Sequence, residues 1–402
     1  MDEHIAILVI TIVVLGYGYI SAFLAKINIS GPMVFTTVGL LLSSLVFGVV
    51  DSKPNSEFIT ITTEIALIIV LFSDASSLNL KQLQWELPVR LLFIGLPLTI
   101  VFATIVGILI FPQENILYIL LLALLLAPTD AALGKIVVSD KKIPLKIRSA
   151  INVESGLNDG IVFPILLGVI VAITHKQEDV GLIHLFLYVG KEIIIGAIVG
   201  AIIGYLNAKI SLFLMSKKEV KAAYKNLLPL AIAILAYYAA EGFGGNGFIA
   251  AFFGGLFFGN FNERLKINVD NFAESESELL LLIVFMVFGF TFIPATIAFW
   301  NIKVLLYAIL SLTFLRIVPV AVSLIGTKLD MASVLFIGWF GPRGIASVLY
   351  ILIVVHQVVN IKGHEIIYSV ATLTILMSIF LHGLSAEPLV KLYNKSYMRG
   401  SK

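Results

Sequence analysis

The sequence predicts an all-α protein that crosses a membrane many times, and three observations support this class. Of its 402 residues, 59% are hydrophobic and only 13% are charged, whereas soluble domains carry about 25% charged residues. The mean hydropathy is +1.04. Apolar runs of about 20 residues, the length at which a helix spans a bilayer, recur along the chain with short connections between them. We therefore expect one polytopic membrane domain, residues 1–402, without a soluble insertion.

Thirteen apolar segments are expected to be membrane spans. The first follows an acidic start, Met-Asp-Glu-His, which lacks the basic region of a signal peptide, so we expect this segment to be retained. Residues 389–402 are expected to form a short cytoplasmic tail after the last span. The segments are 5–25, 32–50, 58–73, 88–111, 115–137, 149–173, 183–208, 226–241, 247–260, 278–297, 303–326, 331–355 and 365–388.

Lysine and arginine residues predict the orientation of the chain. With the N-terminus outside, the inner loops hold twenty of the 27 Lys and Arg residues and the outer loops hold four. Arg90, Lys135 and Lys303 lie near the ends of their segments and are counted with the adjoining loops, whereas the other three, Lys191, Arg316 and Arg343, lie within spans. Because the inner loops of membrane proteins are enriched in positive charge, we expect a cell-membrane protein with a cytoplasmic C-terminus.

Segments 1–6 and 8–13 are interpreted as two six-helix repeats, inverted relative to each other because one segment separates them. The fifth segment is interrupted at Pro128-Thr129-Asp130 and the twelfth at Gly338–Gly344. Helix breaks at corresponding positions of two repeats indicate the substrate site of a transporter. The alternative is a pair of ordinary proline kinks, but each break also carries a charge.

The sixth segment carries acidic side chains in an apolar run. Each carboxylate, Glu154 and Asp159, costs roughly 2.5 to 3.5 kcal/mol in hydrocarbon even on a lenient scale. Ser155 lies one helical turn before Asp159, and Glu154 lies one turn before Asn158. This side of the helix therefore presents hard oxygen ligands for an alkali cation. A buried carboxyl group can hold a cation or a proton, but not both well, and this competition couples two ions that move in opposite directions.

The break at Thr129 is expected to complete the site. Unwound backbone at 128–130 offers carbonyl oxygens, and the Thr129 hydroxyl can ligate or orient a cation. Opposed half-helix ends also leave partial charges inside the membrane. We expect Asp130 to offset the positive ends and Arg343 the negative ends. Direct cation ligation by the Asp130 side chain remains open beside this structural role.

Two further charged positions need partners or explanations. Arg316 lies within the eleventh segment, where a lone guanidinium is costly. Glu154 is its expected partner, in a structural pair that withdraws Glu154 from ion binding; ligation by Glu154 is the alternative. Asp74, at the inner end of the third segment, is either part of the inner mouth of the site or an interfacial cap residue.

Several functions are excluded or left without support by the residues. The chain has no cysteine, so disulfides and thiolate metal sites are excluded. No nucleotide-binding motif is present, so ATP is not the expected energy source. We expect no cofactor beyond the transported ions and no nucleic-acid partner. Position alone does not single out any of the six histidines as a pH sensor. The glycine-rich stretch 242–247 predicts a tight turn, and the small residues after it favour close helix packing.

Four stretches of the chain resemble the sodium/proton exchanger family, specifically the prokaryotic NhaP type related to animal NHE exchangers. They are APTDAALGKIVVS, RSAINVESGLNDGIVFP, NGFIAAFFGGLFFGN and FIGWFGPRGIASVLY. The resemblance implies a thirteen-helix, NhaA-like antiporter fold that forms a homodimer. It also implies a core of residues 88–173 and 303–388. This core moves in an elevator-like alternating-access cycle against a dimerisation part of residues 5–73 and 183–297.

The resemblance also implies roles for single residues. Asp159 resembles the family's essential ion- and proton-binding carboxylate, and Asn158 resembles the partner beside it. Thr129, Ser155 and the backbone near Asp130 resemble the other cation ligands. Electrogenic relatives have two aspartates at the Asn-Asp position. The uncharged Asn158 therefore implies electroneutral exchange.

Structural charges of the family are matched as well. Glu154 with Arg316 resembles its ion pair, and Asp130 with Arg343 resembles its charge compensation at the helix crossing. One position departs from the pattern. Some relatives have a glutamate near the end of the third span that contributes to the site, whereas the nearest acid here is Asp74.

The expected function is secondary antiport of Na⁺ or Li⁺ against H⁺ across a lipid bilayer, not an enzymatic reaction. K⁺/H⁺ exchange is the alternative, because an oxygen-only ligand set serves either cation. A sodium-coupled symporter needs a second polar cluster for its solute, which we do not find in the sequence. An intramembrane aspartyl protease would use Asp130 and Asp159, but neither lies in a Tyr-Asp or Gly-x-Gly-Asp context.

Overall fold

The architecture is that of a computed structural model, and the regular elements it describes are all helices. The described residues are 3–49, 57–78, 85–130, 133, 137, 140, 142–174, 182–262, 265, 267, 269, 278–358 and 363–400. The helices of the first half are α1 (Glu3–Lys26), α2 (Gly31–Leu42), α3 (Glu57–Ser77), α4 (Glu86–Arg90), the π-helical η1 (Leu91–Gly95), α5 (Leu96–Ile110), α6 (Ile116–Leu125), α8 (Leu145–Thr174) and α9 (Leu182–Ser216). The others are α10 (Ala222–Gly242), α11 (Gly247–Phe261), α13 (Glu278–Thr296), the 3₁₀ turn η4 (Ile297–Phe299), α14 (Ile302–Leu312), α15 (Phe314–Ser323), α16 (Met331–Trp339), α17 (Ile345–Gln357) and α18 (Glu365–Gly400).

The predicted multi-pass helical class is confirmed. Among the described residues, seven helices are long and apolar enough to cross a membrane, and four shorter helices are also apolar. Each of the thirteen predicted segments contains at least one helix. The number of spans and the direction of the chain stay predictions.

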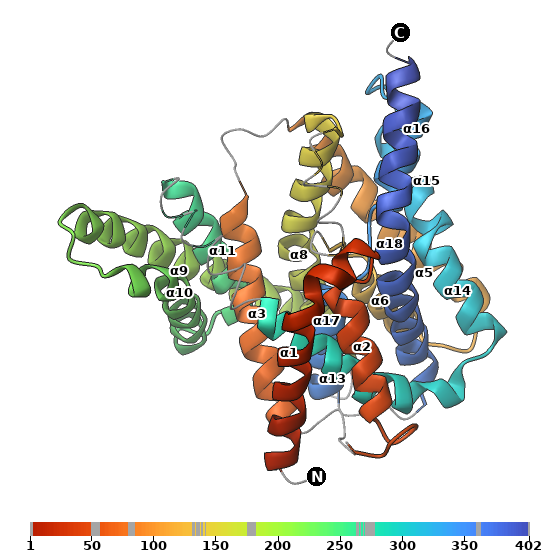
Figure 1. The fold of residues 1–402 in the computed structure, drawn as a ribbon, viewed down its shortest axis with the longest axis horizontal. Helices are drawn as coiled ribbons and strands as arrows, with labels where there is room; N and C mark the ends of the chain where they lie inside the picture. Colours follow the sequence, from red (N-terminus) through yellow and green to blue (C-terminus); the bar gives the residue numbers. More distant parts are fainter. Residues whose placement is uncertain are drawn as a thin grey trace. The chain divides into compact units, whose positions relative to one another are not determined.

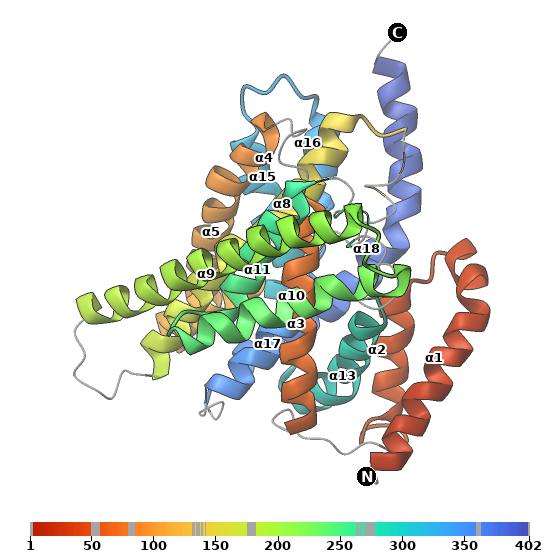
Figure 2. The same cartoon turned by 90° about the vertical axis from the view of Figure 1, so that its left-hand side faces the viewer.

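Backbone contacts divide the chain into two compact units (Figures 1 and 2). The first unit contains Met1–Thr60, Gln84–Asn158 and Leu281–Lys402, and the second contains Ile61–Leu83 and Asp159–Leu280. Boundaries fall inside α3, α8 and α13, so each of these helices contributes to both units.

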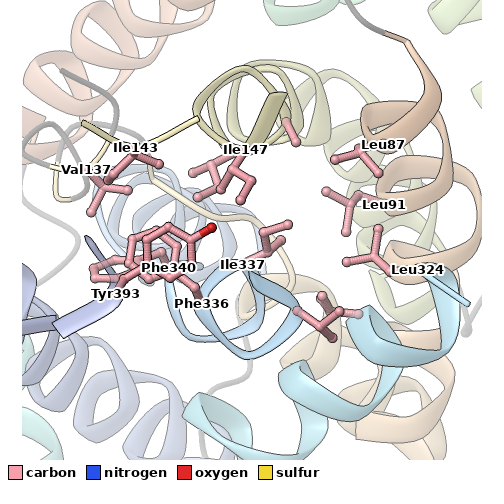
Figure 3. Close-up of a cluster of buried hydrophobic side chains, with 14 of the residues drawn as sticks. Leu87, Leu91, Val137, Ile143, Ile147, Leu324, Phe336, Ile337, Phe340 and Tyr393 are labelled. Carbon is pink, nitrogen blue, oxygen red and sulfur yellow. The ribbon is translucent and has the colours of Figure 1, made fainter. Parts of the chain in front are cut away.

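A hydrophobic cluster in the first unit joins α4, α8, α15, α16 and α18 (Figure 3). The last helix contributes Val390 and Tyr393, and the hydroxyl groups of Tyr393 and Ser333 lie 2.7 Å apart. The helix therefore continues to Gly400, through residues that the sequence predicted to form a short tail. Its apolar face extends beyond the predicted span because α16 offers it a partner.

Two predicted spans of the first unit are less regular than expected. The fourth contains the π-helical turn η1 between α4 and α5. The eleventh is divided into α14 and α15 at Thr313, whose backbone leaves the helical region with φ −119° and ψ −91°. Arg316 follows directly in the first turn of α15, so this interruption places a charged residue near a helix end.

Close helix packing organises the second unit. One face of α9 carries three glycines at which an added Cβ atom would collide with a backbone carbonyl oxygen. The colliding pairs are Gly196 with Asn246, Gly200 with Ala250, and Gly204 with Gly254. Figure 2 shows α9 and α10 running side by side. The predicted turn at 242–247 joins α10 to α11, and Asn246 Oδ1 caps α11 by accepting from Ile249 N (3.1 Å). The small residues of α11 that were expected to favour close packing, among them Gly254, thus face glycines of α9 that the sequence analysis did not single out.

Candidate functional site

Two interrupted helices meet in the first unit. The fifth predicted span is helical only to Leu125 and continues as non-helical backbone to Asp130; the twelfth is broken between Trp339 and Ile345. Asp130 N donates to Pro342 O (2.9 Å), so the two breaks contact each other directly. Both breaks lie at the residues where the sequence predicted them.

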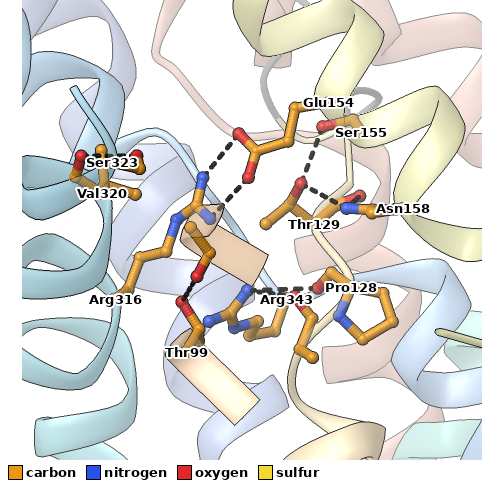
Figure 4. A network of polar contacts seen from close by, with 12 residues as sticks. Thr99, Pro128, Thr129, Glu154, Ser155, Asn158, Arg316, Val320, Ser323 and Arg343 are labelled. Atoms are coloured by element: carbon orange, nitrogen blue, oxygen red, sulfur yellow. Dashed lines mark hydrogen bonds and ion pairs between the residues drawn. The ribbon is translucent and has the colours of Figure 1, made fainter. Parts of the chain in front are cut away.

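The charged residues of the breaks bind opposite helix ends. Asp130 Oδ2 accepts from Ile345 N (2.8 Å), the first N–H group of α17, where the helix dipole is positive. Arg343 Nη1 donates to the carbonyl oxygens of Ala127 (3.0 Å) and Pro128 (3.3 Å), just beyond the C-terminal end of α6 (Figure 4). One Asp130 oxygen is thus engaged in compensating a helix end.

Two glycines permit this close approach. A Cβ atom at Gly344 would collide with the Asp130 carboxylate. At Gly341 it would lie 2.6 Å from Arg316 Nε and 3.0 Å from Thr129 Cγ2. Any other residue at these positions would push the two breaks apart.

Buried polar groups gather around Thr129 (Figure 4). Asn158 Nδ2 donates to Thr129 Oγ1 (2.8 Å), and the oxygens of Thr129 and Ser155 lie 3.0 Å apart. Since Thr129 Oγ1 accepts from the amide, its own proton is available to Ser155. Asn158 is 0% exposed, and its Oδ1 atom has no hydrogen-bond partner among the described residues. A buried acceptor of this kind is a ready ligand for a cation.

Glu154 and Arg316 form a buried bidentate pair. Arg316 Nη1 donates to Oε1 (2.6 Å) and Nη2 to Oε2 (2.7 Å), and both residues are only 1% exposed. Both carboxylate oxygens of Glu154 are therefore used by the guanidinium. Removal of one member of such a buried pair leaves the other charge uncompensated, which costs about 3–5 kcal/mol.

Asp159 follows Asn158 in α8 and belongs to the second unit. It is 3% exposed and lines a small cavity with room for about one water molecule. The cavity is otherwise apolar, and its walls include Phe163, Phe248 and Phe252. Within α8, Asp159 is one turn from Ser155, so the helix itself presents the two oxygen-bearing side chains on one face.

Asp74 lies in the last turn of α3 and is exposed. Leu71, one turn earlier, lines the cavity beside Asp159, but Asp74 does not. The helix continues to Ser77, so Asp74 precedes its end. A place for Asp74 at the inner mouth of the site stays a prediction.

Sequence reasoning did not identify Ser378 and His382 as part of this region. Ser378 Oγ accepts from Arg343 N (2.6 Å). Ser378 and His382 are both buried, and both lie on α18. The sequence feature that could have indicated them is a hydroxyl and an imidazole one helical turn apart in an apolar segment. Their partners, however, lie far away in the sequence.

Comparisons with known proteins agree with this architecture. The family model described as the transmembrane sodium/hydrogen exchanger matches residues 8–392. A Na⁺/H⁺ antiporter of Schizosaccharomyces pombe is 29% identical over 311 residues, which is 70% of this chain and 66% of the relative. The K⁺/H⁺ antiporter NhaP of Alkalimonas amylolytica is 25% identical over 395 residues, 95% of this chain and 66% of the relative. The chain thus spans just under two thirds of the length of these relatives.

A solved structure shows the same fold. The sodium proton antiporter MjNhaP1 from Methanocaldococcus jannaschii, at pH 8, aligns with a TM-score of 0.80 over 98% of this chain and 100% of that chain, at 20% identity. The antiporter fold expected from the motifs is therefore confirmed. Because the family model covers nearly the whole chain, this protein belongs to the transmembrane sodium/hydrogen exchanger family.

Proposed function

We propose that this chain exchanges Na⁺ or Li⁺ for H⁺ across a membrane, and that Asp159 holds the cation and the proton in turn. One observation carries the proposal: the Asp159 carboxyl group is only 3% exposed and lines a small, otherwise apolar cavity, where a bound proton or cation is favoured over an uncompensated charge. Glu154 binds Arg316 through both oxygens, and an Asp130 oxygen binds the first turn of α17. These contacts give Glu154 and Asp130 structural roles in the first unit.

The ligands that the family motif assigns beside Asp159 suit an alkali cation. Thr129 and Ser155 supply hydroxyl oxygens, Asn158 Oδ1 supplies an amide oxygen, and Asp159 supplies the charge. A cation on Asp159 displaces its proton, so each ion leaves only when the other can take its place. Because Asn158 is uncharged, one carboxylate titrates, and exchange is one-for-one and electroneutral.

K⁺/H⁺ exchange is the second candidate, because several relatives, including that of Alkalimonas amylolytica, are named K⁺/H⁺ antiporters. The oxygen ligands serve either ion. Proton flux in proteoliposomes with Na⁺, Li⁺ and K⁺ each added alone separates the two candidates. Flux with Na⁺ or Li⁺ and none with K⁺ supports the first, and the reverse pattern supports the second.

The proposal includes an arrangement in the membrane. The chain lies in a cell membrane as a homodimer, with its N-terminus outside and its C-terminus in the cytoplasm. A core of residues 88–173 and 303–388 carries the ions while a dimerisation part, 5–73 and 183–297, stays in place. The excess of Lys and Arg in the predicted inner loops supports this orientation.

Asp159→Asn tests the proposal in proteoliposomes. The amide keeps the size of the side chain but holds no exchangeable proton and no charge, so cation-driven proton movement is expected to vanish. Asp330→Asn is the matched control. Asp330 is exposed and caps α16, and asparagine caps a helix equally well. Cation-driven proton flux that survives in Asp159→Asn contradicts the proposal.

A further inference from the structure

Ser378 and His382 hold both ends of the break between α16 and α17. They lie one turn apart on α18 and are 0% and 1% exposed. Ser378 Oγ accepts from Arg343 N (2.6 Å), and His382 Nε2 lies 3.0 Å from Trp339 O. Trp339 is the last residue of α16, and Arg343 lies just before α17. One helix thus binds the two sides of the interruption.

The hydrogen bonds place one proton on the His382 ring. Trp339 O is a carbonyl oxygen that only accepts, so His382 Nε2 carries a proton. Ser378 Oγ receives the Arg343 N–H, so its own proton is available to His382 Nδ1 at 3.1 Å. His382 Nδ1 also lies 3.2 Å from the carbonyl oxygen of Ser378, so the hydrogen bonds accommodate either a neutral ring protonated at Nε2 or a doubly protonated ring. The neutral ring is the form we infer, because the imidazole is buried. A second ring proton would displace the serine proton and add positive charge near Arg316 and Arg343.

This contact reaches the ligand region through Arg343. Ser378 fixes the backbone of Arg343, whose Nη1 atom in turn holds the carbonyl oxygens of Ala127 and Pro128. Pro128 directly precedes Thr129, the residue that receives the Asn158 amide. A shift of the α16–α17 break would therefore move Thr129 relative to Asn158.

We infer that His382 is a positioning residue for the cation site. As a neutral ring it holds the break in place through Trp339 and Ser378, and it carries neither the cation nor the transported proton. The transport measurements below rest on the proposed antiport, whereas the spectroscopic one does not.

Two substitutions separate positioning from proton transfer. His382→Gln keeps an N–H donor close to the Nε2 position and cannot titrate, whereas His382→Leu removes every donor and acceptor. Loss of the buried bond is expected to raise the half-saturating Na⁺ concentration about tenfold in His382→Leu. His382→Gln is expected to restore it toward the wild-type value, with an unchanged pH profile. His356→Leu makes the same replacement at an exposed residue of α17 and is expected to leave both quantities unchanged.

The possible results distinguish a positioning role of His382 from a role in proton transfer. A folded His382→Leu protein with wild-type half-saturation overturns the inference. So does a shift of the pH profile shared by both His382 variants, because that result identifies a titrating ring.

If His382→Leu does not fold, ¹⁵N NMR of the imidazole in the unmodified protein decides, with His382→Gln identifying the signal. A neutral ring protonated at Nε2 at about pH 6 and about pH 8 supports the inference, and a doubly protonated ring overturns it. Absence of exchange by the unmodified protein overturns the proposed function instead, while the NMR result still tests His382.

Discussion

The crossing of the two breaks and the packing of α9 on α11 hold helices together by opposite means. At the crossing, Asp130 and Arg343 bind helix ends through charge-assisted hydrogen bonds. In the α9–α11 contact, glycines let the two backbones pack closely by van der Waals contact. The first arrangement fails when one member of a pair is lost. The second fails when any side chain is added.

This difference predicts two kinds of defect. Changes at the crossing alter the ligand geometry as well as stability, because Arg343 and Asp130 hold the backbone on either side of Thr129, the residue that binds Asn158. Changes in the glycine contact alter stability and leave the ion dependence of the surviving protein unchanged. Substitutions of Arg316, Gly200 and Thr129 test this separation.

Arg316→Ala is expected to cause the largest loss, about 3–5 kcal/mol, because it leaves the Glu154 carboxylate buried without its partner. The yield of folded protein and the thermal unfolding temperature in detergent measure the effect. Lys391→Ala is the matched control, since it breaks an ion pair with Glu387 that is exposed and screened by solvent. Equal stability of the two variants contradicts a structural role for the buried pair.

Gly200→Ala is expected to destabilise the protein by about 1–3 kcal/mol, because the added methyl group meets the backbone of Ala250. Gly190→Ala is the control within the same helix. Its Cβ atom meets nothing within 4 Å, and alanine favours a helix by up to about 1 kcal/mol. Thermal unfolding compares the two, and the half-saturating Na⁺ concentration of both is expected to equal that of the wild type. A changed ion dependence in Gly200→Ala would break the proposed separation.

Thr129→Val is expected to have the smallest effect on stability, about 1 kcal/mol, with a clear effect on ion binding. The substitution removes the hydroxyl that joins Asn158 to Ser155 while keeping the volume of the side chain. The half-saturating Na⁺ concentration should rise about tenfold, whereas Thr129→Ser keeps the hydroxyl and should stay near the wild type. Sodium flux at graded concentrations measures both. If flux depends on the Na⁺ concentration in the same way in the valine and serine variants, the Thr129 hydroxyl does not ligate the cation.

The features that the sequence predicted well are those with a large local cost. An isolated Arg316 or Glu154 in an apolar segment is expensive, so each predicted a partner, and the structure joins them. The breaks at Pro128 and near Pro342 combine a helix breaker with a charge, and both are observed.

Proline alone was not a sufficient signal. Pro164 and Pro229 lie inside the continuous helices α8 and α10, whereas the interruption at Thr313 occurs without proline or glycine. Contacts between distant parts of the chain were also inaccessible. The pairing of His382 with Trp339 depends on how α18 packs against a break, and hydropathy does not encode that packing. The extension of α18 beyond residue 388 has the same origin, because α16 supplies its apolar partner.

Proton release on cation binding is the most direct test of the central claim that one carboxylate holds either ion. Na⁺ is added to purified protein in weakly buffered detergent solution, and the released protons are counted with a pH indicator. The wild type is expected to release close to one proton per chain, and Asp159→Asn none. Equal proton release by the two proteins, or sodium binding by the wild type without proton release, would contradict the claim.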